Sequence, residues 1–286
     1  MPDHPDQHYH RQSIFRIDPR EAQALSALPK HPTEGTEFFY RNVVRTLKGV
    51  MWAQGMRIVV EGAENFPQTG GALIACNHTG YYDFIFAGIA AELRGHRLVR
   101  FMSKKEIFDV PVVGAMMRAM KHIPVDRSAG RGAFDEAVRR LDQGQLVGIF
   151  PEATISRSFE LKEFKNGAVR IADSAGVPLI PMAIWGSQRV WTKDHPRNLG
   201  RSNTPIVIVV GTPIDPAGEP DEATERLRDA MAELLTRAQS IYERDFGPIE
   251  KGQYWMPARL GGTAPTLERA QEIEQEEKAR RQAKKK

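Results

Sequence analysis

A histidine and an aspartate five positions apart are the residues of this chain best suited to acid–base chemistry. His78 follows an apolar run, and Asp83 stands at the head of a second apolar segment. If the chain turns from strand to helix between them, the Asp83 carboxylate can accept a hydrogen bond from one imidazole nitrogen. That bond would fix the tautomer and leave the other nitrogen free to take a proton. The pair is therefore predicted to act as a general base, which needs no protein nucleophile when the substrate supplies a hydroxyl group.

Other catalytic classes leave recognisable motifs, and this sequence lacks them. It contains no G-x-S-x-G elbow, no P-loop and no G-x-G-x-x-G fingerprint. It has no closely spaced Cys/His cluster of the kind that binds zinc, so we expect neither a metal nor a cofactor. The single cysteine, Cys76, lies inside the apolar run, where a buried thiol is the common state. A Cys–His nucleophile pair is therefore disfavoured. An isolated histidine is more often structural than catalytic, so the prediction depends on the pair of His78 and Asp83.

Predicted strands and helices alternate along the chain. Apolar runs predict strands at residues 57–62, 73–77, 98–103, 123–125, 145–150, 177–184 and 206–210. Helical spacing occurs at residues 82–93, 132–141, 166–175 and 221–245. This alternation is typical of an α/β domain with a mostly parallel central sheet flanked by helices. His78 would then lie at the carboxyl end of a strand, where such sheets bind ligands.

Further polar groups follow other predicted strands. Glu152 and Thr154 come directly after one apolar run, and Arg157 lies three positions later. Lys105 and Arg127 also follow strands. Cations placed after strand ends can converge on a phosphate, which arginine binds with paired hydrogen bonds and lysine as a point charge. Each taken singly is more often an ordinary surface cation, so a phosphate site requires that they converge near the general base.

The composition indicates a folded protein of 286 residues, 41% hydrophobic and 27% charged, with a net charge of +4. This small basic excess suits an anionic membrane surface or substrate, though many proteins with neither partner share it. One cysteine excludes an intramolecular disulfide and agrees with a reducing compartment. The N-terminus lacks a signal-peptide pattern, and no run reaches the ~18 apolar residues of a transmembrane helix. We expect a cytoplasmic protein with peripheral membrane contact and no nucleic-acid partner.

The two ends of the chain differ from the centre. Residues 1–35, rich in proline, histidine and charge, are predicted to be a flexible arm. Residues 36–55 have the spacing of a basic amphipathic helix, which lies in a membrane interface or packs on its own domain. Its candidate interfacial anchors are Phe38, Phe39 and Trp52.

The C-terminal region is predicted from its charge. Residues 56–246 should hold the folded α/β domain, and residues 247–286 form a charged tail. A solvated tail is the first interpretation. The alternative is that its terminal lysines help to hold an anionic membrane.

Four blocks of this sequence follow one another in a characteristic order. The first is Asn-His-x4-Asp at residues 77–83, and the third is Phe-Pro-Glu-x-Thr at residues 150–154. Between them stands His-Ile-Pro-Val-Asp-Arg at residues 122–127, and the fourth block is residues 177–183. Together they resemble the glycerolipid acyltransferase superfamily, typified by the bacterial 1-acyl-sn-glycerol-3-phosphate acyltransferases. The H-x4-D motif alone would be weak, but four ordered blocks are specific.

The resemblance implies a role for each candidate residue. His78 would be the general base and Asp83 its orienting partner, while Arg127 would bind the acceptor phosphate with Lys105. The other candidates would contribute to the acceptor site: Asn77, Glu152, Thr154 and Arg157. The acceptor would be a lysophospholipid at an anionic membrane surface. Its hydroxyl would attack the thioester of acyl-CoA or acyl-carrier protein directly, without an acyl-enzyme.

One departure from the superfamily concerns the acceptor. The third block usually reads Glu-Gly-Thr-Arg, whereas residues 152–155 are Glu-Ala-Thr-Ile and the next basic residue is Arg157. One phosphate ligand is thus lost unless Arg157 replaces it. The first hypothesis is acylation of lysophosphatidic acid to phosphatidic acid in phospholipid biosynthesis. The second, suggested by Ala153 and Ile155, is the same chemistry on another lysolipid or glycolipid hydroxyl. The third is a non-catalytic lipid-binding protein.

Overall fold

The computed structural model describes residues 9–126 and 131–283. The strands in these residues are β1 (His10–Gln12), β2 (Phe15–Ile17), β3 (Arg57–Glu61), β4 (Ala72–Cys76), β5 (Val99–Lys104), β6 (Ile123–Val125), β7 (Leu146–Ile149), β8 (Leu179–Trp185) and β9 (Pro205–Val210). The α-helices are α1 (Pro19–Ser26), α2 (Phe38–Ala53), α3 (Asp83–Ala91), α4 (Lys105–Phe108), α5 (Val113–Ala119), α6 (Gly132–Asp142), α7 (Gly167–Ser174), α8 (Pro220–Phe246) and α9 (Leu267–Ala283).

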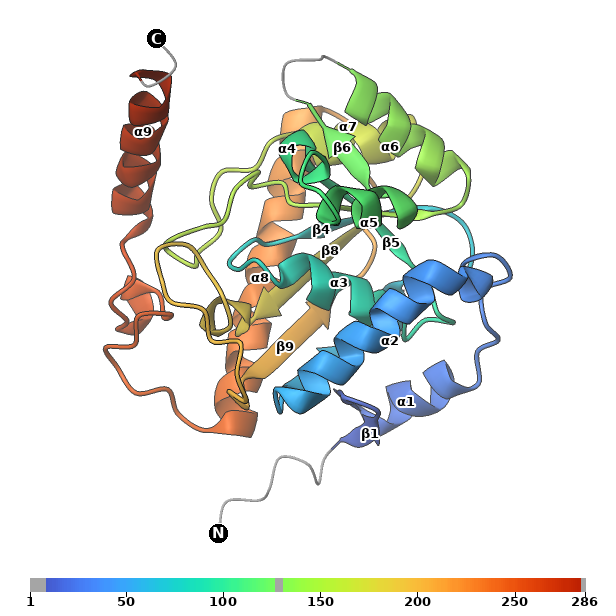
Figure 1. Cartoon of the computed structure of the whole chain (residues 1–286), viewed down its shortest axis with the longest axis horizontal. Helices are drawn as coiled ribbons and strands as arrows, with labels where there is room; N and C mark the ends of the chain where they lie inside the picture. Colours follow the sequence, from blue (N-terminus) through green and yellow to red (C-terminus); the bar gives the residue numbers. More distant parts are fainter. Residues whose placement is uncertain (1–8, 127–130, 284–286) are drawn as a thin grey trace.

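Within the described part of the chain the nine strands form one sheet in the order β1-β2-β3-β9-β8-β4-β7-β5-β6. The pairs β1–β2 and β8–β9 are antiparallel, and the other neighbours are parallel. Helices lie on both faces of the sheet (Figure 1). The predicted fold class, an α/β domain with a mostly parallel sheet, is confirmed.

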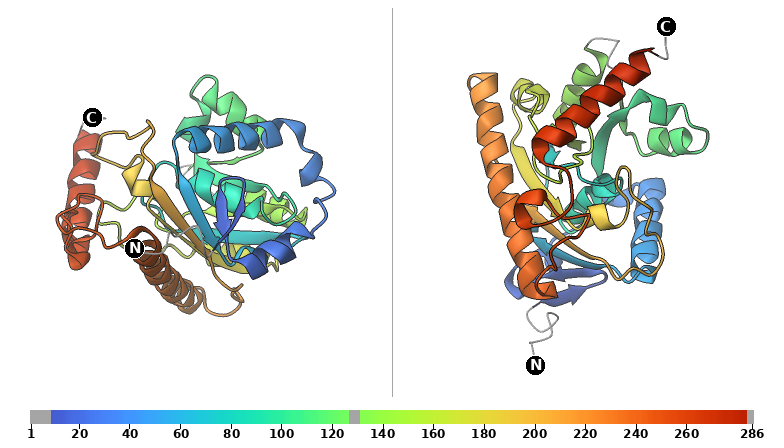
Figure 2. Two further views of the ribbon diagram at one scale, coloured as in Figure 1. Left: turned by 90° about the horizontal axis from the view of Figure 1, so that it is seen from below. Right: turned by 90° about the vertical axis from the view of Figure 1, so that its left-hand side faces the viewer.

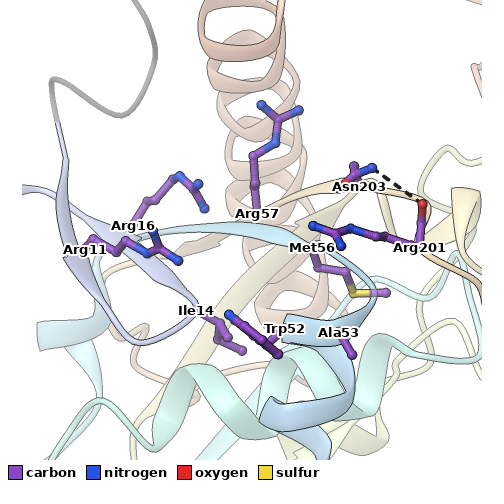
Figure 3. A pocket seen from close by; sticks show the side chains of 10 residues that line it. Arg11, Ile14, Arg16, Trp52, Ala53, Met56, Arg57, Arg201 and Asn203 are labelled. Carbon is purple, nitrogen blue, oxygen red and sulfur yellow. Dashed lines mark hydrogen bonds between the residues drawn. The ribbon is translucent and has the colours of Figure 1, made fainter.

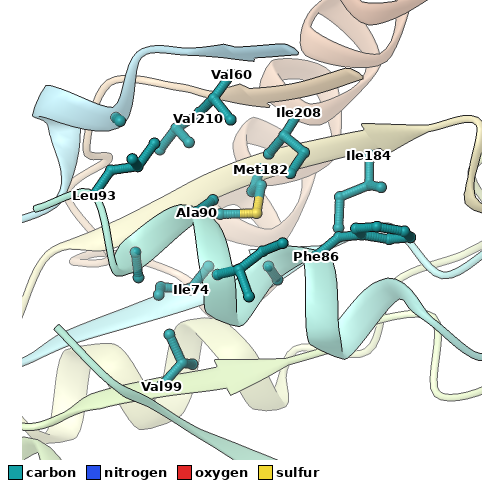
Figure 4. Packing of buried hydrophobic residues seen from close by; sticks show 14 of the residues in the cluster. Val60, Ile74, Phe86, Ala90, Leu93, Val99, Met182, Ile184, Ile208 and Val210 are labelled. Carbon is teal, nitrogen blue, oxygen red and sulfur yellow. The ribbon is translucent and has the colours of Figure 1, made fainter. Parts of the chain in front are cut away.

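The strands direct alternate side chains into two hydrophobic cores. Ile58 and Ile74 belong to the core on the face of α2 and α3, whereas Val59 and Leu73 belong to the core on the face of α7 and α8. Figure 4 shows the first core, where Phe86 and other α3 residues pack over the sheet. Because β4 is buried on both faces, its sequence is apolar throughout rather than alternating.

The N-terminal region corrects the prediction of a flexible arm. Residues 1–8 lie outside the described residues, but β1, β2 and α1 follow, and β2 pairs in parallel with β3. Phe15 and Ile17 are fully buried. Farther along, the Glu34 carboxylate binds the buried Arg97 guanidinium at 2.8 Å. These strands have only three residues each, which is too short to show a periodic pattern, and the buried ion pair joins residues far apart in sequence.

Helix α2 packs on its own domain, which is one of the two alternatives predicted for it, and the membrane-interfacial alternative stays a prediction. Tyr40 and Met51 are buried against the sheet, and the Tyr40 hydroxyl donates to the carbonyl of Val99 at 2.7 Å. On the outer side Phe38 is 79% exposed and Trp52 is 67% exposed. The helix therefore packs on the domain while presenting aromatic side chains to the surroundings. Among the described residues no helix is both long and apolar enough to cross a bilayer.

The C-terminal region is more closely attached than a solvated tail. After α8, Trp255 and Met256 are buried in the same core as α8, and Ala264 joins them. Helix α9 then lies along the side of the molecule formed by the loops that follow β7 and β8 (Figures 1 and 2). The prediction from charge density missed these contacts because the apolar residues are isolated in a polar sequence.

Candidate active site

His78 and Asp83 form the hydrogen bond that their spacing predicted. Nδ1 of the imidazole lies 2.9 Å from Oδ2 of Asp83. The same oxygen accepts the backbone N–H groups of Thr79 at 2.7 Å and Gly80 at 2.8 Å, and the Ser187 hydroxyl donates to Oδ1. This carboxylate is held as an acceptor, so Nδ1 carries the proton and Nε2 is the basic atom. The His78 side chain is 20% exposed while Asp83 is fully buried, so a substrate can reach only the base.

Asn77 ties the residues that follow β4 to the neighbouring strand. Its Oδ1 accepts the N–H of Ile184 at 2.7 Å, and its Nδ2 donates to the carbonyl of the same residue at 3.0 Å. The side chain thus continues the hydrogen bonding of the sheet one residue beyond β4. Because its oxygen and nitrogen are both engaged and the residue is buried, Asn77 positions His78. The structure gives no support for the predicted contact of Asn77 with substrate.

Gly80 lets the turn between His78 and Asp83 pass close to another loop. A Cβ atom at this position would lie 3.0 Å from Oγ of Ser187 and 3.0 Å from the carbonyl oxygen of Trp191. The adjacent Tyr81 N–H donates to that same carbonyl at 2.9 Å. Any larger residue at Gly80 would therefore have to displace Ser187 or the Trp191 carbonyl by a few tenths of an ångström.

Glu152 braces His78 from the end of β7. Its Oε1 accepts the backbone N–H of His78 at 2.8 Å, and its Oε2 accepts the backbone N–H of Lys162 at 3.2 Å. Burial raises the pKa of Glu152 to about 7, while the two N–H donors act in the opposite direction. Both oxygens are committed to the backbone. Glu152 therefore fixes the backbone position of His78, and its predicted contact with substrate stays a prediction.

The ring of His78 is supported by an aromatic neighbour. Phe150 stacks on the imidazole with centroids 4.2 Å apart and an interplanar angle of 19°. The carbonyl of His78 accepts the N–H of Ser156 at 2.7 Å. Since β4 and β7 are adjacent and parallel, the segments after both strands meet here. The sheet thus brings together two motifs more than 70 positions apart.

Thr154 and Arg157 face a C-terminal helix. The Thr154 hydroxyl donates to Oε1 of Glu274 at 3.3 Å and accepts a hydrogen bond from Lys162 Nζ. Arg157 binds Asp194 through Nε at 2.5 Å and Glu277 through Nη2. The side chain of Arg157 is only 6% exposed. Both predicted acceptor-site residues are therefore engaged by acidic groups.

The other two predicted cations, Lys105 and Arg127, follow β5 and β6 rather than β7. Lys105, at the start of α4, pairs with Asp126 at 2.9 Å and is largely exposed. Arg127 lies outside the described residues. The predicted convergence of Lys105, Arg127 and Arg157 around His78 therefore stays a prediction.

Sequence reasoning missed residues that come from distant segments. Ser187, which orients Asp83, follows β8. It lies 104 positions after Asp83 in the sequence. Lys162 and Lys193 lie beside Arg157 without a motif to mark them; Lys193 donates to the carbonyl of Ile155 at 3.5 Å, and burial lowers its pKa. A cavity of about 580 Å³ opens at this place and is lined in part by Tyr81, Arg157, Trp191, Lys193, Arg197 and Glu277.

Cys76 is fully buried at the end of β4. Burial raises the pKa of its thiol well above the ordinary range. The thiolate needed for nucleophilic attack is thereby disfavoured. The prediction of a buried, inert thiol is confirmed.

Comparison with known proteins identifies the family. The family model described as Acyltransferase matches residues 57–185, which include the His78–Asp83 pair and Glu152. A 1-acyl-sn-glycerol-3-phosphate acyltransferase of Bacillus subtilis (strain 168) is 33% identical over 148 residues, covering 51% of this chain and 71% of the relative. The chain belongs to the glycerolipid acyltransferase superfamily. It is accordingly an enzyme of the acyltransferase class, as the sequence predicted.

Two further relatives extend this comparison of the acyltransferase. A 1-acyl-sn-glycerol-3-phosphate acyltransferase of Borreliella burgdorferi is 28% identical over 201 residues, which covers 66% of this chain and 76% of that protein. The crystal structure of PlsC, an LPA acyltransferase from Thermotoga maritima, has a similar fold, with a TM-score of 0.59 and 21% identity over 77% of this chain and 88% of PlsC. Helix α9 lies beyond the residues that the family model matches.

Proposed function

We propose that this acyltransferase transfers a fatty acyl group from acyl-CoA to lysophosphatidic acid and forms phosphatidic acid. The observation that carries the proposal is the bond between His78 Nδ1 and Asp83, which leaves Nε2 basic on an accessible ring. The names of the bacterial relatives supply the acceptor. The third initial hypothesis, a non-catalytic lipid-binding protein, is disfavoured because the dyad and its support are complete.

The geometry supports a direct transfer. Nε2 of His78 would take the proton of the acceptor hydroxyl while the oxygen attacks the thioester carbonyl. The new ester bond forms as the carbon–sulfur bond breaks, and the imidazolium returns its proton to the thiolate that leaves. Asp83 would stabilise the positive charge on the imidazole between these steps. The donor carrier, CoA or acyl-carrier protein, is a substrate in this scheme, and no cofactor takes part.

A second candidate acceptor is a lysolipid or glycolipid without a terminal phosphate. Ile155, which stands where the superfamily usually has arginine, is an apolar residue and is buried. It cannot bind an anion, and the Nε atom of Arg157 is paired with Asp194, which leaves only the Nη atoms of Arg157 for a phosphate. These observations favour testing the phosphate requirement directly.

The enzyme is proposed to work at the cytoplasmic face of an anionic membrane as a peripheral protein. Phe38, Phe39 and Trp52 are exposed on α2. The two views of Figure 2 place α2 and the α4–α5 pair on the same side of the molecule. The α4–α5 segment also exposes apolar residues, including Val110, Val112 and Val113. An apolar surface of this kind is typical of proteins that dip into the headgroup region.

A basic cavity at the end of α2 adds electrostatic attraction to this surface. It has a volume of about 250 Å³, and Figure 3 shows Arg11 and Arg201 reaching into it from opposite sides with Trp52 and Ile14 beneath them. Arg16 and Arg57 also line it. Several guanidinium groups beside an exposed tryptophan would attract anionic lipid headgroups.

The proposed reaction is tested with a panel of acceptors. Purified enzyme is mixed with radiolabelled oleoyl-CoA and lysophosphatidic acid, lysophosphatidylcholine or monoacylglycerol, and the products are identified by mass spectrometry. Phosphatidic acid should form at least ten times faster than either other product, because one hydrogen-bonded charge pair is worth at least this factor. Equal rates with monoacylglycerol would favour the phosphate-free acceptor, and no product from any acceptor would refute the proposed function.

A further inference from the structure

Two carboxylates of α9 lie on buried cations beside the active site. Glu274 binds Lys162 Nζ at 2.9 Å, and Glu277 binds Nη2 of Arg157. The Lys162 side chain is 8% exposed and that of Arg157 is 6% exposed, whereas the carboxylates remain partly exposed. The cations are thus built into the domain, and their partners approach from outside.

These cations are connected to the general base by short hydrogen-bonded paths. The carboxylate of Glu152 accepts the backbone N–H of His78 at one oxygen and that of Lys162 at the other. Arg157 follows Ser156, whose N–H donates to the His78 carbonyl. An anion held between Lys162 and Arg157 would therefore lie next to the residues that position the base.

Helix α9 has little else to hold it in place. Of its side chains that are described, only Ala270 is buried. Its carboxylates at Glu274 and Glu277 are partly exposed, and ion pairs with exposed partners are weak because water and salt compete for them. A buried lysine and arginine, by contrast, require an anion close by.

A phosphate monoester would satisfy both cations at once. It carries about −1.5 to −2 charges near pH 7 and offers three acceptor oxygens. Arginine binds two phosphate oxygens in parallel and lysine binds as a point charge. Two carboxylates on one helix, three positions apart, supply a similar charge with less suitable geometry.

We propose that Lys162 and Arg157 bind the phosphate of the acceptor and that Glu274 and Glu277 occupy this site until the acceptor displaces them. This inference rests on the proposed acylation of a phosphate-bearing lysolipid. Lys162 then replaces the arginine absent from the third block. Helix α9, which lies outside the residues shared with the family model, acts as an internal competitor for the acceptor.

The competition is tested by removing the two charges. The variant E274Q/E277Q should lower the KM for lysophosphatidic acid about three- to tenfold with little change in kcat, since two weak ion pairs are lost. The matched control is E272Q/E276Q, which neutralises two α9 carboxylates that pair with Arg269 on the same helix. An unchanged or higher KM in E274Q/E277Q would overturn the proposal, and so would a fall in the KM for acyl-CoA alone.

The role of Lys162 is tested separately. K162M should raise the KM for lysophosphatidic acid at least tenfold, by a larger factor than the KM for monoacylglycerol, whereas K162R should retain most of the affinity. Equal effects on both acceptors would assign Lys162 a structural role only. If the wild-type enzyme acylates no lysolipid, the proposed function fails; if it acylates lysophosphatidic acid but K162M is unaffected, only this inference fails.

A measurement on the unmodified protein is independent of activity. Hydrogen exchange of residues 267–283 is followed with glycerol 3-phosphate and with sodium chloride at equal ionic strength. Displacement of α9 predicts faster exchange with the phosphate monoester only. Identical exchange in both solutions at saturating glycerol 3-phosphate would contradict the displacement.

Discussion

The active site depends on carboxylates that work through the backbone. Asp83 accepts hydrogen bonds from the His78 imidazole, the N–H groups of Thr79 and Gly80, and the Ser187 hydroxyl. Glu152 holds His78 and Lys162 by their N–H groups. Asp83 and Glu152 thus each order a segment of backbone through the N–H groups that they accept. His78 is thus held in place in the structure without substrate, and such a fixed orientation favours the proposed proton transfer.

Replacing Glu152 by glutamine should destabilise the enzyme although size and shape are kept. A glutamine has one acceptor oxygen, so one of the two buried N–H groups would face an NH₂ group. The free energy of unfolding in urea should fall by about 1–3 kcal/mol. The matched control is E106Q on the exposed side of α4. An unfolding midpoint equal to that of the wild type would show that Glu152 does not brace the loop.

The contacts of single residues show how far sequence reasoning reached. Asp83 could be found because it is five positions from His78 and a strand-to-helix turn brings the two together. Ser187 and Lys162 could not, because they reach the site through the pairing of strands and the path of long loops. Asn77 and Glu152 were found as candidates for substrate contact, and the structure shows that both stabilise the backbone around His78.

At the scale of elements, long regular segments were predictable and short or isolated ones were not. The central strands are apolar throughout and appeared in the sequence as clear runs, as did α3 and α8. By contrast β1 and β2 have three residues each and depend on pairing with β3. Helix α9 is polar all round, and its position depends on Lys162, 112 residues away. No local pattern records such a contact.

Helix α2 is expected to carry the membrane contact. The triple variant F38A/F39A/W52A removes three exposed aromatic side chains and should weaken sedimentation with vesicles of phosphatidylglycerol and phosphatidylcholine at least tenfold, because burial of each aromatic ring in the interface is lost. Thermal stability should hardly change, since these side chains are exposed.

The control for the α2 variant is L199A/L260A, which truncates two exposed leucines that lie on other segments. This variant should bind vesicles like the wild type. Unaltered vesicle binding by the α2 variant would move the membrane contact to another surface, such as the α4–α5 segment.

At the scale of the whole molecule, buried polar groups connect the layers and make stability depend on pH. His122, which precedes β6, accepts the N–H of Phe101 at Nδ1 at 2.9 Å and is almost fully buried. Burial and the nearby Arg100 lower the pKa of His122 to about 3. The folded protein therefore keeps this ring neutral at pH values where the unfolded chain protonates it.

The consequence is a loss of stability on the acid side. The contribution of His122 is complete above the ordinary histidine pKa of about 6.5 and is lost as the pH falls toward 3, by up to about 1.4 kcal/mol for each pH unit. In H122N the amide oxygen can accept the same N–H without being protonated. The free energy of unfolding in urea should therefore fall less steeply in H122N than in the wild type as the pH is lowered from 6.5 toward 3. If the free energy of unfolding fell equally steeply with pH in H122N and in the wild type, His122 would not be the origin of this pH dependence.

The fold as a whole explains why a simple pair suffices for chemistry. Adjacent parallel strands β4 and β7 bring the His78 and Glu152 segments together. Strand β8 holds Asn77 through Ile184, and Ser187, which follows β8, holds Asp83. The acceptor brings its own nucleophile and the donor its own leaving group. Under the proposed mechanism the protein contributes one base, the groups that orient it and cations to place the acceptor.

The most direct test of this account is the rate of acyl transfer to lysophosphatidic acid by H78A. Loss of a general base should lower kcat by about 10²–10⁴ while the protein stays folded. The matched control is H96A, which removes another histidine bound to a carboxylate, Glu92, at 2.8 Å; its kcat should stay within about twofold of the wild type because surface substitutions are mild. An H78A enzyme with a kcat close to that of H96A would contradict the assignment of His78 as the base.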